Sequence, residues 1–249
     1  MAPRQSRCPA APLPPPPVDL TEVWERLATG RARVAADVIG DTHCGLLLRS
    51  SAGAEGGVFG RQRLIVESVL QGICQNCIAI DLNIASSSVA TYARQGLKRL
   101  GVDTRPSRVP STLMLIASIA GCPGANAPAM IAPCDLDGAF TFRVPRPDLC
   151  LRGLLSPAEY DTVSRLFEGQ SYAEIARRRR TSVRTIANQL ASAFRILTVS
   201  GRSQLIRRAF VLSGWLPTCE IGPREIARAS YLRGPSHRRA FTHDLYSGA

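Results

Sequence analysis

Residues 155–212 carry three helix-start signals in close succession, and these signals divide the segment into short helices. Ser156 stands before a proline and precedes Glu159 by three positions, which is the pattern of an N-cap with a capping box. Ser171 is followed by a glutamate at the same spacing, and Ser182 stands before another run with helical periodicity. Apolar residues recur every three or four positions in each part. The segment is therefore predicted to fold into four short helices, each with one buried face.

The third of these predicted helices, about Ser182–Leu197, has an apolar stripe on one side and a polar, basic surface on the other. The helix before it is short, and a tight turn separates the two. Two short helices in this arrangement, with a polar and basic outer face on the second, suit insertion into the major groove of DNA. Residues 155–212 are therefore predicted to be a helix-turn-helix module that binds double-stranded DNA.

The residues of this segment also carry a family resemblance. The segment resembles the LuxR/FixJ-type (GerE-like) helix-turn-helix domain, and the matching pieces cover nearly the whole of that domain in the right order. These pieces are L-S-P-A-E at 155–159, E-G-Q-S at 168–171, A-E-I-A at 173–176, T-S-V-R-T-I at 181–186 and V-S-G-R-S-Q-L at 199–205.

The resemblance implies a four-helix domain that binds DNA and regulates transcription, with its third helix in the major groove and its fourth often used for dimerisation. It implies phosphate contacts at four positions of the third helix, namely Arg184, Thr185, Gln189 and Arg195. It implies base contacts at Ala187, Asn188 and Ala191. The DNA-binding set of this module is completed at the start of the fourth helix by Arg202 and Ser203.

Two departures from the family pattern affect this expectation. The family prefers a basic residue where Ala187 stands, so base readout here would rest mainly on Asn188. The turn before the third helix usually carries a leucine and then a glycine, whereas this chain has Arg179 and Arg180. If the turn residue keeps a positive φ, an arginine there costs on the order of 1 kcal/mol relative to glycine.

A second, weaker copy of the same pattern lies 97 residues earlier, in residues 63–102. Its turn holds Leu82-Asn83, and asparagine tolerates the left-handed conformation. The start of its fourth helix, near Arg108, fits only after an insertion of roughly five residues. A fixed period of this kind indicates duplication. The positions that match are Gly72 with Gly169, Ile78-Ala79 with Ile175-Ala176, Val89 with Ile186, Lys98 with Arg195 and Leu100 with Leu197.

A β-hairpin is predicted before each copy. Residues 32–50 would form the first, with a turn near Gly40-Asp41, and Ala129–Cys134 with Phe140–Val144 would form the second. A short helix is predicted over residues 18–30. The linker R-V-P-R-P-D at 143–148 is predicted to extend away from the second hairpin, because proline disfavours helix in the residue before it.

The expected fold is mainly α with two small β-hairpins, and it consists of two tetrahelical helix-turn-helix modules in tandem. This arrangement, including the phrase V-P-R-P, is similar to that of a group of tandem LuxR-like regulators in myxobacteria. The expected divisions are a disordered tail, the first hairpin with a degenerate module, the second hairpin with a linker, the LuxR-type module and a basic tail. They span residues 1–17, 18–120, 121–150, 151–214 and 215–249.

The recognition helix of the first copy would present hydroxyl side chains and Arg94, with Lys98 and Arg99 near its end, and Asp81 adds a negative charge close to the turn. Hydroxyl groups can contact phosphate. Two interpretations stay open: a weak second DNA reader, which would make the chain a built-in dimer on two half-sites, or a degenerate copy kept for packing or dimerisation. The residues that would contact DNA are Ser87, Ser88, Thr91, Tyr92 and Lys98.

The formal net charge of +12 is unevenly distributed along the 249 residues. Residues 1–149 carry 15 basic and 12 acidic groups, whereas residues 150–249 carry 16 basic and 7 acidic groups. The excess therefore accompanies the stronger module, where it would neutralise phosphate charge. The run Arg177–Arg180 is expected to contact phosphates beside the binding site.

Neither an enzyme nor a bound cofactor is expected. The three histidines have no partner at catalytic spacing, and no P-loop or receiver segment is recognisable. Of the eight cysteines, Cys74 and Cys77 have C-x-x-C spacing, but no second pair or histidine pair completes a zinc set. The cysteines are therefore interpreted mainly as small buried residues, without a metal or redox role.

The alternative to DNA binding is a protein-interaction module on a helix-turn-helix scaffold, with DNA binding weakened or lost. The weak first copy and Ala187 favour it, whereas the charge of the second half opposes it. Homodimer formation, and RNA polymerase or another regulator as partner, stay open. No membrane contact is expected, because the apolar run Leu113–Ala120 is too short to span a bilayer. A cytoplasmic location is therefore expected.

Overall fold

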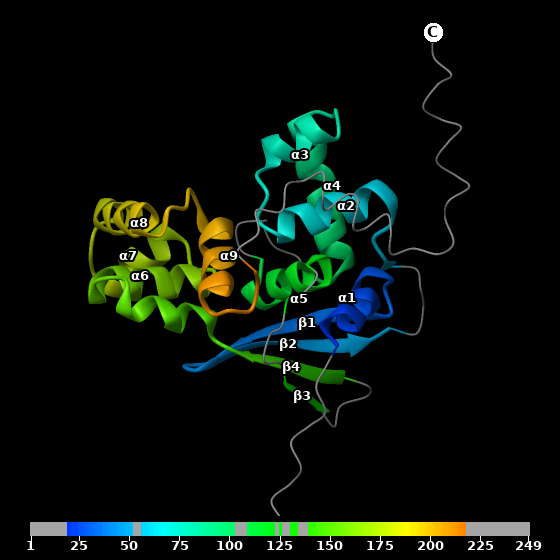
Figure 1. Cartoon of the computed structure of the whole chain (residues 1–249), viewed down its shortest axis with the longest axis horizontal. Coiled ribbons are helices and arrows are strands. Elements are labelled where there is room, and N and C mark those ends of the chain that lie inside the picture. Colours follow the sequence, from blue (N-terminus) through cyan, green and yellow to red (C-terminus); the bar gives the residue numbers. More distant parts are fainter. Residues whose placement is uncertain are drawn as a thin grey trace, which may run out of the picture.

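The computed structural model describes residues 19–51, 56–102, 109–122, 125, 130–133 and 139–217. The tail expected at 1–17, the neighbourhood of Arg108 and most of the tail expected at 215–249 lie outside these ranges. The described part is mostly helical, with one small antiparallel sheet (Figure 1). This confirms the expected mainly-α class.

The sheet has four strands in the order β1-β2-β4-β3. Both predicted hairpins form, but they are not separate units, because β2 pairs directly with β4. All three pairings are antiparallel. The strands are β1 (Ala32–Ile39), β2 (His43–Ser50), β3 (Met130–Pro133) and β4 (Ala139–Pro145).

Strands β2 and β4 are equivalent strands of the two repeats, and they pair with each other symmetrically. Leu46 pairs with Phe142, and Gly45 pairs with Arg143. Adding 97 to Gly45 gives Phe142, and adding 97 to Leu46 gives Arg143, so exchanging the two repeats leaves the register unchanged. The same strand thus meets its own copy, which is the arrangement found at a two-fold interface between identical subunits.

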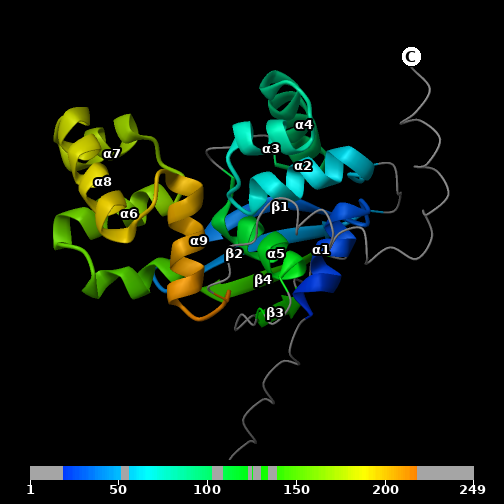
Figure 2. The ribbon, with the colours of Figure 1, turned by 45° about the horizontal axis from the view of Figure 1, so that its top comes forward.

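One face of the sheet is covered by helices α1 (Leu20–Ala28) and α5 (Ser111–Gly121), as Figure 2 shows. Alternate strand residues such as Leu46 and Phe142 point into this layer and are fully buried. Helix α5 is buried along residues 111–120, in keeping with its uniformly apolar sequence. It is therefore the centre of the core.

Within the described ranges, no helix combines the length and the apolar character that crossing a membrane requires.

Each half contributes a group of three helices beside this layer (Figure 1). The four helices predicted in residues 155–212 all form, and the side chains of Ser156, Ser171 and Ser182 accept the expected cap hydrogen bonds. The first group comprises α2 (Gly60–Leu70), α3 (Gln75–Asp81) and α4 (Ser86–Arg99). The second comprises α6 (Pro157–Phe167), α7 (Tyr172–Arg179) and α8 (Val183–Leu197), and α9 (Arg202–Leu212) follows it.

The backbone repeats with the same period as the sequence. Helices α2, α3 and α4 begin 97 residues before α6, α7 and α8. Helix α5 begins 91 residues before α9, so the insertion in the first copy amounts to six residues. Left-handed residues recur at the 97-residue spacing in three pairs: Gly72 and Gly169, both with φ 83°; Asn83 with φ 49° and Arg180 with φ 52°; and Gly101 with φ 89° and Thr198 with φ 54°.

The linker after β4 does not extend away from the hairpin as predicted. Residues Pro147–Gly153 form a 3₁₀ helix, η3, that packs against α6 and α9. The Arg146 guanidinium binds both oxygens of the buried Asp148 carboxylate at 2.9–3.0 Å. It also donates to Glu168 Oε1 at 3.0 Å and to Gly40 O at 3.1 Å. The expectation failed because proline restricts the residue before it, whereas Pro147 itself suits a first helical turn.

The two halves contact each other directly. Arg207 Nη1 of α9 donates to Gln71 O of the first half at 3.3 Å. A Cβ atom added to Gly72 would lie 3.2 Å from Ser203 O, so the backbones approach closely here. Trp215 stacks on Phe210 and is buried, so the described start of the segment 215–249 belongs to the core.

Candidate nucleic-acid interface

Helices α7 and α8 meet at a short turn whose shape is set by two residues. Arg180 adopts a left-handed conformation with φ 52° and ψ 45°, which ends α7. The Ser182 hydroxyl then accepts a hydrogen bond from the backbone N–H of Thr185 at 3.0 Å and begins α8. Buried Ile175 and Ile186 hold the two helices against α6. The turn therefore presents the outer side of α8 to solvent.

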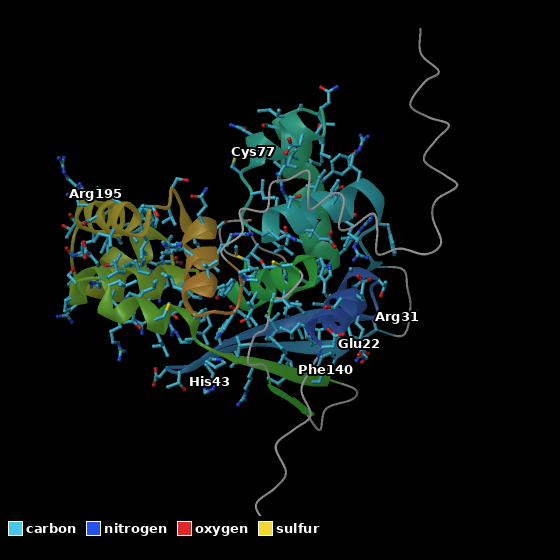
Figure 3. All side chains as sticks on the ribbon, in the orientation of Figure 1. Glu22, Arg31, His43, Cys77, Phe140 and Arg195 are labelled. Carbon is cyan, nitrogen blue, oxygen red and sulfur yellow. The ribbon has the colours of Figure 1, made fainter. Side chains whose placement is uncertain are left out.

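Helix α8 carries two parallel stripes. Its inner stripe, at residues 186, 190, 193 and 197, is buried. Its outer stripe has the same four-three-four spacing and is exposed. Figure 3 shows Arg195 of this stripe at the edge of the molecule. The outer stripe consists of Arg184, Asn188, Ala191 and Arg195. We call these four residues the α8 stripe.

The other α8 residues that the family resemblance implies as DNA contacts are less available to a partner. Thr185 is exposed, with its hydroxyl 2.8 Å from Ser182 Oγ, and Ala187 is half-buried. Gln189 Oε1 accepts hydrogen bonds from Thr162 Oγ1 at 2.7 Å and from Arg179 Nη1 at 2.6 Å. The Gln189 oxygen is therefore committed to the packing of α8 against α6, not to the outer face.

Arg179 likewise differs from the rest of the run Arg177–Arg180. Its Nε lies 3.1 Å from Asp161 Oδ2, and its Nη1 donates to Ala158 O at 3.2 Å. These bonds hold α7 against α6, so the Arg179 guanidinium is already engaged within the module. The side chains of Arg177, Arg178 and Arg180 are exposed, so α7 and the turn after it add three positive charges to the surface of this module.

Arg202 is the member of the expected DNA-binding set with the most buried guanidinium. Its Nε donates to Leu166 O at 3.0 Å, and its Nη2 donates to Val109 O at 2.9 Å. Burial lowers the pKa of this guanidinium to about 10. Arg202 thus joins α9 to the end of α6 and to the segment before α5. Its neighbour Ser203 packs against Gly72, so both residues lie where the two halves meet.

Helix α4 of the first half has an exposed stripe equivalent to that of α8, but with different side chains. Ile65, Ile78 and Val89 form a small buried cluster between α2, α3 and α4. On the outer side, Ser87, Thr91, Tyr92 and Lys98 are exposed and Ser88 is half-buried. The residues that lie 97 positions before the α8 stripe are Ser87, Thr91, Arg94 and Lys98, and all four are exposed. Each stripe therefore carries two positive charges: Lys98 is equivalent to Arg195, whereas Arg94 and Arg184 stand at different positions.

Sequence reasoning missed the buried Arg146–Asp148 pair, and no local pattern points to it, because its partners come from three separate segments. It also gave no warning that Arg202 is internal. His43 lies at the start of β2 and its Nδ1 is 2.8 Å from Thr42 Oγ1 (Figure 3). Among the described residues, no group of three or more potential metal ligands comes together.

Comparisons with family models, with curated proteins and with solved structures gave no match to this chain.

Proposed function

We propose that this protein is a sequence-specific, double-stranded-DNA-binding regulator of transcription, with α8 as its recognition helix in the major groove. The observation that carries the proposal is the α8 stripe, which combines two arginines with an asparagine on one exposed helix face. The helix has a left-handed turn and a serine cap at its start. An α-helix of this size fits the width of the major groove.

The residues of the α8 stripe suit two kinds of contact, to phosphates and to bases. Arg184 and Arg195, one at each end, reach phosphates, and exposed Arg177, Arg178 and Arg180 add to the positive field. Asn188, between the two arginines, has an amide group that can donate to N7 of an adenine and accept from its N6 amino group in the major groove. Ala191 is small enough to let the helix approach the bases and to contact a thymine methyl group.

We further propose that the chain is a tandem of two helix-turn-helix units. The equal spacing of helices, left-handed residues and exposed stripes supports this. For the first unit, one observation favours protein contact over DNA contact. Ile80 of α3 is 78% exposed, more than Val183 and Ile196 of α8 at 50% and 51%, and so large an exposed apolar side chain suits contact with a protein. RNA polymerase or another regulator would be the partner there.

The test is binding of the full chain to fragmented genomic DNA, followed by titration of the best fragment at several salt concentrations. Arg184→Ala and Arg195→Ala should weaken binding to all sequences and reduce the slope of log affinity against log salt by about 1 each. Asn188→Ala should mainly relax sequence preference, by about 1–3 kcal/mol at one base pair.

A matched control is Arg143→Ala, which removes one exposed positive charge from the sheet. It should leave the salt slope unchanged. If no fragment binds in a salt-dependent manner at low ionic strength, the proposal fails. If Arg143→Ala lowers the slope as much as Arg195→Ala does, the affinity is a general charge effect and α8 is not the binding element.

A further inference from the structure

Cys74 and Cys77 differ from the cysteines that the sequence led us to expect. Both are exposed, and their sulfur atoms lie 2.7 Å apart at the start of α3. Cys44 and Cys122, by contrast, are buried, and burial raises the pKa of Cys44 to about 11. Figure 3 shows Cys77 on the side of the first helical group that is turned toward the second. The pair is therefore accessible to reagents in solution.

The two thiols have different environments. Cys74 is the N-cap residue of α3, and its sulfur accepts a hydrogen bond from the backbone N–H of Cys77 at 3.2 Å. The Cys77 thiol and this N–H lower the pKa of Cys74, whereas the interaction with Cys74 raises the pKa of Cys77. Because the thiolate is the reactive form, Cys74 is the better nucleophile and Cys77 the resolving partner.

A groove gives small molecules access to Cys74. It lies between the α3–α4 region and residues 200–204 of the second half, and its volume is about 360 Å³. Gly72, Ile73, Cys74 and Gln75 form part of its wall. A space of this size is comparable to the smaller ligand pockets of proteins, so it can admit a peptide-sized disulfide.

The residues between the cysteines connect the pair to the recognition helix of the first half. The Gln75 side-chain amide donates to Ser86 O, and Asn76 Oδ1 accepts a hydrogen bond from Ser86 Oγ at 2.7 Å. Ser86 is the first residue of α4. A bond between the two sulfurs would close a ring around Gln75 and Asn76, and would thereby restrain the start of α4.

We propose that Cys74 and Cys77 form a reversible redox site that is oxidised by low-molecular-weight disulfides and tightens the start of α4. The Cys74 thiolate attacks one sulfur of the disulfide R–S–S–R, forms a mixed disulfide and releases the first R–S⁻. Cys77 loses its proton and attacks the Cys74 sulfur, which releases the second R–S⁻. The protein thus loses two electrons and two protons, and the disulfide becomes two thiols. This site does not depend on DNA binding.

The experiment exposes the reduced full-length protein to oxidised glutathione near neutral pH, blocks remaining thiols with iodoacetamide and digests with trypsin. The tryptic peptide 64–94 contains Cys74 and Cys77 and no other cysteine. In the wild-type chain this peptide should become lighter by two hydrogens, carry no glutathione and return to the reduced form with dithiothreitol. Hydrogen exchange at residues 86–89 should slow severalfold on oxidation.

Three variants separate the roles. Cys77→Ser should retain glutathione on Cys74, because the resolving thiol is missing. Cys74→Ser should react about tenfold more slowly at Cys77. Cys150→Ser, the control, should behave as the wild-type chain does. Two results would overturn the proposed redox site. One is complete alkylation of both cysteines by iodoacetamide after prolonged exposure to oxidised glutathione. The other is an equal rate of reaction with glutathione in Cys77→Ser and Cys74→Ser. Unchanged exchange at residues 86–89 in the oxidised protein would overturn its connection to α4.

Discussion

Arg180 and Asn83 lie 97 residues apart and close equivalent turns with the same left-handed backbone, at φ 52° and φ 49°. Asparagine adopts this conformation readily, whereas arginine pays a steric cost because its Cβ crowds the following carbonyl. The half that carries the α8 stripe therefore has the more strained turn. This relationship gives the first prediction.

Replacing Arg180 with glycine should raise the free energy of unfolding by about 1 kcal/mol, because glycine relieves the steric cost of a left-handed residue. Urea denaturation of the full chain measures it. Arg178→Gly is the matched control: this exposed arginine lies within α7, so its replacement should lower stability by about 0.5–1 kcal/mol. A less stable Arg180→Gly protein would show that the turn is not strained as described.

The second prediction concerns Arg202. Arg202→Met should lower the free energy of unfolding by about 2 kcal/mol, because Leu166 O and Val109 O would lose their guanidinium donor. Arg195→Met, at an exposed position, should change stability by less than about 0.5 kcal/mol. Denaturation curves of both variants test this. The salt slope of DNA binding should fall only for Arg195→Met, and the opposite pattern would make Arg202 the DNA contact.

The third prediction concerns the buried ion pair of Arg146 and Asp148. Asp148→Asn should lower the free energy of unfolding by about 3–5 kcal/mol, since it leaves the buried guanidinium without its main counter-charge. Asp161→Asn, which weakens more exposed pairs with Arg165 and Arg179, should cost less, about 1 kcal/mol. Chemical denaturation compares them. Equal losses in the two variants would mean that Arg146 is held mainly by its other partners.

The fourth prediction concerns pH. Hydrogen bonds from the Ser192 and Ser156 side chains and from the Ser156 backbone lower the pKa of Glu159. A carboxyl group with a lowered pKa in the folded state stabilises the protein above its unfolded pKa, about 4.3, and loses this contribution as the pH falls through the folded value.

Glu159→Gln should therefore have a lower melting temperature than the wild-type chain at neutral pH, and the difference should close in acid. Thermal melts over a pH series measure this difference. The glutamine retains a side-chain oxygen for the capping box, so the comparison isolates the charge. A difference that is the same at every pH would show that the carboxylate charge of Glu159 does not contribute.

Much of the local structure could be predicted from the sequence. The caps at Ser156, Ser171 and Ser182 and the left-handed turn at Asn83 all follow from residues a few positions apart. Such hydrogen bonds and backbone preferences act within one helical turn, so the sequence contains the whole interaction. The α8 stripe follows from helical periodicity in the same way.

Contacts between distant segments could not be obtained in that way. Neither the joining of the hairpins through β2 and β4 nor the inward direction of Arg202 leaves a local pattern. The exposure of Cys74 and Cys77 also depends on how α3 sits on its neighbours.

The sequence by itself determined two related sets of helices with a polar, basic stripe, the second set with serine caps, because caps, periodicity and the 97-residue repeat are local or periodic properties. The tertiary structure alone decided that the copies share one sheet and which arginines are structural. Strand pairing and side-chain burial depend on the packing of the whole chain. The sequence around an arginine therefore does not show whether carbonyl groups or solvent surround its side chain.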